Sequence, residues 1–261
     1  MTEKVIVEQS GQIARIIFNQ PEKRNAVSLE MWDAVEAALD RLSADENVRV
    51  LIMSGAGGKA FVSGADISKF ESERSNEEGV ATYNATTKRV YDKVEAFQKP
   101  TIAQIDGFCV GGGVALAVCC DIRICGDGSN FAIPAARLGL GYGFRGINRL
   151  ANLIGPAFAK EIFFTARRYN ANEAVTMGLV NQVVEDGMVG NAAEEMASMI
   201  CDNAPLTVNA VKYIANQTRM DESQRDLETC EAMVKACFDS EDYVEGRSAF
   251  MEKRKPIWKG Q

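Results

Sequence analysis

Hydrophobic and polar positions alternate at the start of the chain and then change period. The runs V-I-V-E and I-A-R-I-I-F flank Gly11, and this pattern predicts two strands joined by a turn. From Leu29 to Leu42 apolar residues recur at helical spacing, directly after Ser28, a residue type favoured at helix N-caps. The first part of the chain is therefore predicted to be a β-hairpin followed by an amphipathic helix.

The middle of the chain repeats a strand, a glycine-rich turn and a helix. The expected strands are 48–54, 101–105 and 122–125, and the expected helices are 80–97 and 114–120. Because strands alternate with helices, we expect a parallel α/β core. Beyond about Pro156 the pattern is helical, with only one short strand expected, at 179–184.

Two glycine-rich segments each follow a buried strand. One reads G-G-K-A-F-V-S-G-A-D-I from Gly57 to Ile67, and the other runs from Gly107 to Ile124 and contains the triplet 111–113. Glycine lets a ligand approach the backbone, and the start of a helix leaves N–H groups unpaired, so such turns can hold a negatively charged oxygen. A glycine triplet can equally be a tight turn packed on its neighbours. Together the two segments could supply two N–H donors to one oxygen.

Length and composition indicate a cytoplasmic globular chain. With 261 residues, 46% of them hydrophobic, the chain can bury a large core, and we expect a core over 1–195 and a helical region over 196–261. The first residues lack a basic segment followed by an apolar run, and no apolar run approaches the roughly 20 residues of a membrane span, so neither a secretory signal nor a membrane anchor is expected. Seven cysteines without C-x-x-C pairs favour reduced thiols over a disulfide or zinc framework.

The chain contains no histidine, which excludes a Ser-His-Asp triad and a Cys-His dyad and leaves Cys109 without an activating base. A net charge of −7 argues against nucleic acid as a partner. A polyanionic ligand would then depend on local basic groups. These are Lys23 and Arg24 near the start, and Lys253, Arg254, Lys255 and Lys259 at the end.

The two glycine segments, together with N-Q-P-E-K-R-N-A at 19–26 and the C-terminal S-E-D-Y-x-E-G-x-x-A-F-x-E-K-R-K-P at 240–256, resemble the crotonase (enoyl-CoA hydratase/isomerase) superfamily. The resemblance covers nearly the whole chain. It implies a spiral of β-β-α units, C-terminal helices that build a homotrimer or a hexamer of two trimers, and an acyl-CoA substrate with no cofactor beyond the coenzyme A it carries. It also implies that the N–H groups of Ala65 and Gly112 form an oxyanion hole for the thioester oxygen.

The same resemblance implies further substrate contacts. They are Lys23, Arg24, Ala26, Gly64, Asp66, Ile67, Gly111, Ala115, Pro134, Ala135, Arg145, Phe250 and Lys253. Several have a structural alternative. Asp66 can bond N–H groups of its own turn, Arg145 can form a surface ion pair, and a terminal run of charge is often a solvated helix face.

Two positions depart from the hydratase pattern. Crotonase-type hydratases carry glutamates that hold and activate water where this chain has Ala115 and Ala135. An alanine cannot transfer a proton, and general acid–base groups contribute about 10²–10⁴ each in rate. Glu71 and Glu73, in the polar stretch after the first glycine segment, are the candidates to replace them.

Decarboxylation of a malonyl-type thioester forms an enolate without removing a carbon-bound proton. The segment L-G-L-G-Y-G-F-R-G-I, 138–147, resembles methylmalonyl-CoA decarboxylases, with Tyr142 facing the substrate carboxylate, although their histidine and glutamate stand here as Ala65 and Ala115. A lyase of this type is the first hypothesis. The alternatives are a hydratase or isomerase with a non-standard acid/base and a catalytically silent acyl-CoA-binding protein.

Overall fold

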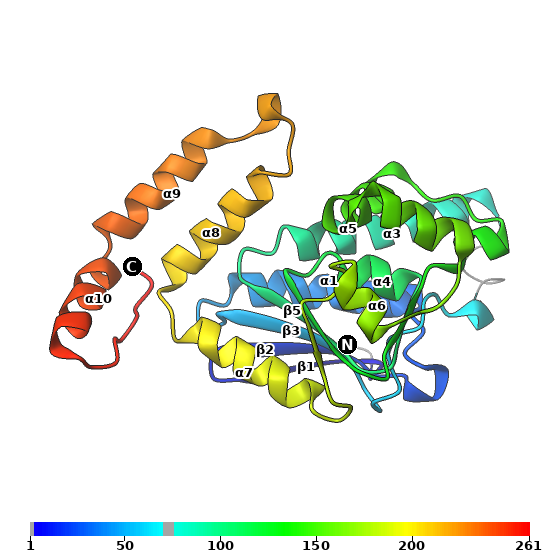
Figure 1. The fold of residues 1–261 in the computed structure, drawn as a ribbon, viewed down its shortest axis with the longest axis horizontal. Helices are drawn as coiled ribbons and strands as arrows, with labels where there is room; N and C mark the ends of the chain where they lie inside the picture. Colours follow the sequence, from blue (N-terminus) through cyan, green and yellow to red (C-terminus); the bar gives the residue numbers. More distant parts are fainter. Residues whose placement is uncertain (1–2, 70–75) are drawn as a thin grey trace.

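The computed structural model describes residues 3–69 and 76–261 (Figure 1). Its strands are β1 Val5–Ser10, β2 Ile13–Phe18, β3 Val50–Gly55, β4 Ala60–Val62, β5 Thr101–Ile105, β6 Phe108–Val110, β7 Ile122–Gly126, β8 Asn130–Ala132, β9 Tyr169–Asn170 and β10 Gln182–Val184. Its α-helices are α1 Leu29–Ala44, α3 Glu77–Glu95, α4 Gly112–Ala117, α5 Phe144–Thr165, α6 Ala171–Thr176, α7 Val189–Cys201, α8 Pro205–Gln217, α9 Leu227–Asp239 and α10 Glu241–Glu252.

The strands form a six-stranded sheet in the order β1-β2-β3-β5-β7-β10 and a four-stranded sheet in the order β4-β6-β8-β9. The predicted hairpin is confirmed, because β1 and β2 pair antiparallel. From β2 to β10 every pairing in the larger sheet is parallel, as expected for strands joined by helical crossovers. The predicted parallel α/β core is therefore confirmed.

The central strand β3 is buried on both faces of the larger sheet. In β3, Val50 and Ile52 pack with residues of α7, while Leu51 and Met53 point into the main core. Side chains alternate between the faces of a strand, so a strand covered on both sides is apolar throughout. The fully buried VLIM sequence of β3 follows from this position.

Helix α1 begins at Leu29 as predicted, but its cap and the start of α3 differ from the expectation. Ser28 lies at the N-cap of α1, but its side chain makes no capping bond, and its buried Oγ has no hydrogen-bond partner among the described residues. Burial of Trp32 and Leu39 stabilises this helix instead. Helix α3 begins three residues earlier than predicted, because the Asn76 side chain accepts from the Gly79 N–H at 2.8 Å and caps it.

The short elements around the glycine triplet also differ. Helix α4 begins at Gly112 and ends at Ala117, whereas the apolar pattern predicted 114–120. A second strand, β9, lies beyond Pro156, where only one strand was predicted. It pairs antiparallel with β8 and closes the edge of the smaller sheet.

The C-terminal helices α8, α9 and α10 extend away from the sheets as an arm (Figure 1). Helix α7 packs on the larger sheet and continues through the predicted boundary at residue 195, so the arm begins at α8. Arg49 donates to the carbonyls of Cys201 and Trp258 and ties the end of the chain to the core. None of the helices within the described ranges has a stretch long and apolar enough to cross a bilayer.

Candidate active site

Three parallel strands bring the glycine-rich loops together. Strand β6 lies between β4 and β8, with Val62 opposite Cys109 and Val110 opposite Ala132. The carboxyl ends of parallel strands meet at one edge of a sheet, so the loops that follow these strands emerge side by side. Residues 63–66 follow β4, and residues 133–135 follow β8. Gly111 follows β6 and leads directly into α4.

The first predicted donor, Ala65, lies in a parallel bridge with Val27. Val27 donates to the Gly64 carbonyl at 2.8 Å and accepts from the Asp66 N–H at 3.0 Å. These bonds involve the Gly64 carbonyl and the Asp66 N–H, so the N–H of Ala65 itself points away from Val27. That N–H has no acceptor in the described part of the chain.

The second predicted donor, Gly112, is the first residue of α4. Gly111 precedes it with φ +55°, donates to the Ala132 carbonyl at 2.8 Å and accepts from the Ala115 N–H at 3.1 Å. The peptide between Gly111 and Gly112 is thus held by its carbonyl, and its N–H points away. Among residues 3–69 and 76–261 this N–H also has no acceptor.

Close packing at this edge requires glycine. A Cβ on Gly112 would lie 3.9 Å from the Gly64 Cα, and a Cβ on Gly113 would lie 2.1 Å from the Val62 carbonyl oxygen. The two loops are therefore in contact through atoms that only glycine leaves free. Helix α4 has six residues, so its dipole contributes little and the donors act as individual N–H groups.

Asp66 is buried and fully engaged. It accepts from the Lys23 ammonium at 2.8 Å and from the Ser68 hydroxyl at 2.6 Å. Burial alone would raise the pKa of Asp66, but these two partners outweigh it and lower the pKa to about 2. The pair ties the 66–68 turn to the first basic loop, which is the structural role that its sequence left open.

A pair of arginines lies beside Phe108. The Arg24 guanidinium is 4.9 Å from the centre of the Phe108 ring, and the Arg168 guanidinium is 5.4 Å from it. Ala26, two residues after Arg24, is buried. Arg168 was not predicted as a site residue, because it lies in a loop far along the chain and only the pairing of β9 with β8 brings it near β6.

Ala115 lies in α4, which follows β6, and Ala135 lies in the short helical turn Pro134–Leu138, which follows β8. The Ala115 carbonyl accepts from the Cys119 thiol at 3.1 Å, and Ala135 is buried directly after Pro134. Burial raises the pKa of Cys119 above its usual range, so this thiol stays protonated. Neither position carries a group that can transfer a proton.

Tyr142 packs edge-on against Phe163, with the ring centres 4.8 Å apart. Burial, then the neighbouring Cys119, raises the pKa of Tyr142 to about 12. Its hydroxyl has no hydrogen-bond partner in the region that the structure describes. Arg145, three residues on, forms an ion pair with Asp92 at 2.9 Å with 64% of its side chain exposed, so its predicted contact with a substrate carboxylate stays a prediction.

Tyr91 is a site residue that the sequence did not indicate. It lies in α3, between buried Val90 and Val94, and its hydroxyl donates to the Gly112 carbonyl at 3.3 Å. From the sequence alone, a tyrosine next to apolar positions of a helix predicts only packing in the core. Only the contact between α3 and α4 assigns it to the site.

Phe250 and Lys253 do not reach this edge within one chain. Helix α10 lies at the far end of the arm from α4 (Figure 1), and Phe250 is 84% exposed. Ile67 begins the short turn Ile67–Lys69 directly after Asp66. Glu71 and Glu73 lie outside the described residues, so their predicted role as replacement acids stays a prediction.

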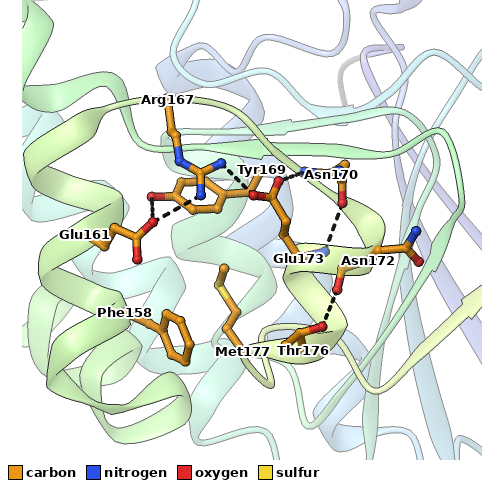
Figure 2. Close-up of a pocket in the computed structure, with 9 residues that line it drawn as sticks. All are labelled: Phe158, Glu161, Arg167, Tyr169, Asn170, Asn172, Glu173, Thr176 and Met177. Atoms are coloured by element: carbon orange, nitrogen blue, oxygen red, sulfur yellow. Dashed lines mark hydrogen bonds and ion pairs between the residues drawn. The ribbon is translucent and has the colours of Figure 1, made fainter.

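A separate hollow of about 290 Å³ lies between α5 and α6 (Figure 2). Its lining residues are Phe158, Glu161, Arg167, Tyr169, Asn170, Asn172, Glu173, Thr176 and Met177. Arg167 pairs with Glu173 at 2.7 Å and with Glu161 at 3.1 Å, and its guanidinium lies 3.7 Å from the centre of the Tyr169 ring. One arginine faces two glutamates here, so the three side chains carry a net charge of −1, and the hollow is a weaker candidate for an anionic ligand than the loop edge. No group of three or more Asp, Glu or Cys side chains in the described residues is arranged to hold a metal ion.

The family model for enoyl-CoA hydratase/isomerase matches residues 8–261. The chain belongs to this family. The predicted crotonase fold is therefore confirmed, as is the prediction of an enzyme from a family that processes acyl-CoA thioesters. The loops that carry Ala65 and Gly112 are thus the candidate active site of a hydratase/isomerase-family enzyme.

Several relatives match over nearly their full length. A short-chain-enoyl-CoA hydratase of Clostridium acetobutylicum is 37% identical and aligns over 96% of this chain and 95% of its own. A carnitinyl-CoA dehydratase of Salmonella enteritidis is 33% identical over 100% of both chains. The crystal structure of an enoyl-CoA hydratase/carnithine racemase from Magnetospirillum magneticum is 34% identical, with a TM-score of 0.93 over 100% of this chain and 97% of that one. These relatives are named as hydratases and dehydratases, so the resemblance to methylmalonyl-CoA decarboxylases stays a prediction.

Proposed function

We propose that this protein binds an acyl-CoA thioester and stabilises its enolate oxygen between the N–H groups of Ala65 and Gly112. The observation that carries the proposal is that these two N–H groups lie on touching loops and are left without an acceptor among the described residues. An oxyanion donor contributes about 10²–10³ in rate. This contribution needs no side chain, so the two alanines do not affect it.

The reaction that the relatives favour is that of an enoyl-CoA hydratase or isomerase. Proteins named short-chain-enoyl-CoA hydratase and crotonyl-CoA hydratase are each 37% identical to this chain over at least 96% of its length. In hydration, water gives one proton to a base as its oxygen bonds to the β-carbon, the π electrons shift through the α-carbon to the carbonyl to form an enolate with the charge on the thioester oxygen, and the α-carbon then takes a proton. The oxyanion hole stabilises the enolate between these two events.

Ala115 and Ala135 require that the water be activated by another group. Tyr142 and Tyr91 both have a pKa raised by burial, so near pH 7 their phenols can donate a proton but cannot act as bases. The base must therefore come from elsewhere, and Glu71 and Glu73 are the first candidates. Arg24 and Arg168 supply positive charge for the phosphates of coenzyme A near the same loops, and Lys23, which is paired with Asp66, lies beside Arg24.

Decarboxylation of a malonyl-type thioester is the second candidate function. Two observations favour it: neither alanine can act as a base, and the Tyr142 hydroxyl, which has no partner within residues 3–69 and 76–261, can donate to a substrate carboxylate. In this reaction the carbon–carbon bond to the carboxylate breaks, CO₂ leaves, and the electron pair becomes the same thioester enolate. The α-carbon is then protonated.

The experiment that tests these candidates is an assay of the purified protein against crotonyl-, 3-hydroxybutyryl-, malonyl- and methylmalonyl-CoA, with products identified by mass. A gain of water by crotonyl-CoA supports the hydratase, and loss of CO₂ from a malonyl thioester supports the decarboxylase. Saturable binding without any product indicates a silent acyl-CoA-binding protein. Absence of binding up to millimolar concentration contradicts the proposed function itself.

A further inference from the structure

We propose that Tyr91 is a positioning residue whose hydroxyl fixes the backbone at Gly112 and thereby orients the second oxyanion donor. The inference rests on the proposed function of the Ala65 and Gly112 N–H groups. Its basis is the bond of 3.3 Å from the Tyr91 hydroxyl to the Gly112 carbonyl, which connects α3 to the first residue of α4.

The backbone at this point needs an external restraint. Gly111 and Gly112 lack side chains, and glycine has more backbone freedom than any other residue. The Gly111 N–H is held by the Ala132 carbonyl, on the side of β8. The Tyr91 hydroxyl holds the Gly112 carbonyl, so the peptide that carries the donor N–H is fixed on both sides.

Tyr91 is itself held in place by aromatic packing. Its ring meets Trp32 edge-on with the ring centres 5.4 Å apart, and the Trp32 indole N–H donates to the Tyr83 hydroxyl at 3.3 Å. Burial raises the pKa of Tyr91 well above 10, so its hydroxyl remains a donor across the physiological range.

Gly112 and Tyr91 also fit each other sterically. A Cβ on Gly112 would lie 3.2 Å from the Tyr91 hydroxyl oxygen, which is tighter than ordinary van der Waals contact. A Cβ at residue 112 would therefore crowd the phenol oxygen, which would have to shift by a few tenths of an ångström. An alanine at 112 would push the hydroxyl away from the carbonyl it restrains.

The test compares the unmodified protein with Tyr91→Phe, which removes only the hydroxyl. Cinnamoyl-CoA is the probe, because hydrogen bonds to its thioester oxygen polarise the conjugated system and move its absorbance to longer wavelength. We expect the unmodified protein to produce this shift and Tyr91→Phe to reduce it by about half or more, as for loss of one of two donors, while the dissociation constant changes by less than about threefold. Tyr213→Phe is the matched control, because it removes a hydroxyl bond to Asp226 in the arm and should leave the shift unchanged.

An undiminished shift in a folded Tyr91→Phe variant would overturn the role of Tyr91 and leave the proposed function intact. Absence of a shift in the unmodified protein would overturn both. If Tyr91→Phe does not fold, Gly112→Ala displaces the hydroxyl with Tyr91 still present, and a full shift in that variant would overturn the inference.

Discussion

Asp66 is the residue whose ionisation most directly couples the first donor loop to pH. Its pKa in the folded protein is about 2, below the usual value of 3.8, because Lys23 and Ser68 outweigh the effect of burial. A lowered carboxyl pKa contributes stability that is present above about pH 4 and is lost as the pH falls toward 2. The 66–68 turn should therefore loosen in acid before the core does.

We expect Asp66→Asn to lower the free energy of unfolding by about 2 kcal/mol at pH 7 and to flatten its decline between pH 4 and pH 2. Urea denaturation at a series of pH values measures both effects. Glu22→Gln, an exposed carboxyl in the neighbouring loop, is the control and should change stability by less than about 0.5 kcal/mol. Equal pH profiles for Asp66→Asn and the unmodified protein would show that the Lys23 pair does not stabilise the loop.

At Tyr142, removal of the hydroxyl oxygen alone can distinguish a role in the reaction from a role in packing. Its ring packs on Phe163, while its hydroxyl has no partner among the described residues. The free energy of unfolding of Tyr142→Phe should therefore lie within about 0.5 kcal/mol of that of the unmodified protein. Its turnover of the substrate identified in the acyl-CoA assay should nevertheless fall by about 10-fold or more. Because the pKa of Tyr142 is about 12, its contribution should stay constant up to about pH 10. Unchanged turnover would mean that Tyr142 only packs.

At the scale of elements, the contact between β4 and α4 sets the separation of the two donors. Gly113 is the residue at this contact, since its added Cβ would lie 2.1 Å from the backbone oxygen of Val62. Gly113→Ala should destabilise the protein by about 1–3 kcal/mol or more and weaken acyl-CoA binding, because the donor loops must move apart. Thermal unfolding and calorimetric titration measure the two losses.

Gly143→Ala is the matched control for this substitution. Gly143 has φ −72°, and a Cβ there would meet nothing within 4 Å, so we expect little change in melting temperature. If Gly113→Ala were as stable and bound as tightly as this control, the close contact of β4 with α4 would not position the donors.

The elements that the sequence predicted well are those with long apolar runs. Strand β5 has the predicted bounds 101–105, and four of its five residues are buried. Strands β4, β6 and β8 have three residues each, which is too short for an alternating pattern to be recognised. Their pairing is nevertheless what brings the two glycine loops together.

The candidate site was predictable where backbone chemistry leaves a signature in the sequence. Gly64, Gly111 and Gly113 mark positions where only glycine fits, so the donor loops could be predicted. Tyr91 and Arg168 could not, because they join the site only through contacts between elements far apart in the chain. The absence of a capping bond from Ser28 could not be predicted either, because that side chain is buried by contacts with the rest of the fold.

At the scale of the whole molecule, the arm exposes apolar surface that one chain does not cover. Leu227, Val234 and Phe238 of α9 are 59%, 43% and 60% exposed, and Phe250 and Met251 of α10 are 84% and 80% exposed. Monomeric proteins rarely expose large contiguous apolar patches. We propose that the arm packs against other copies of the chain in a trimer or a pair of trimers.

Light scattering on the purified protein tests this proposal. We expect a mass three or six times the 28.4 kDa of one chain, and a charged residue introduced by Phe238→Glu should lower it. An exposed apolar residue outside the arm, Phe164, provides the control as Phe164→Glu, which should leave the mass unchanged. A mass of 28.4 kDa for the unmodified protein would contradict the proposal.

In the proposed complex, one thioester oxygen accepts hydrogen bonds from the backbone N–H groups of Ala65 and Gly112. A crystal structure of the protein with acetoacetyl-CoA measures this most directly. We expect the thioester oxygen to lie about 2.7–3.1 Å from both nitrogens, with the acyl chain passing Tyr142. A thioester oxygen bound elsewhere, with either N–H facing solvent, would contradict the account.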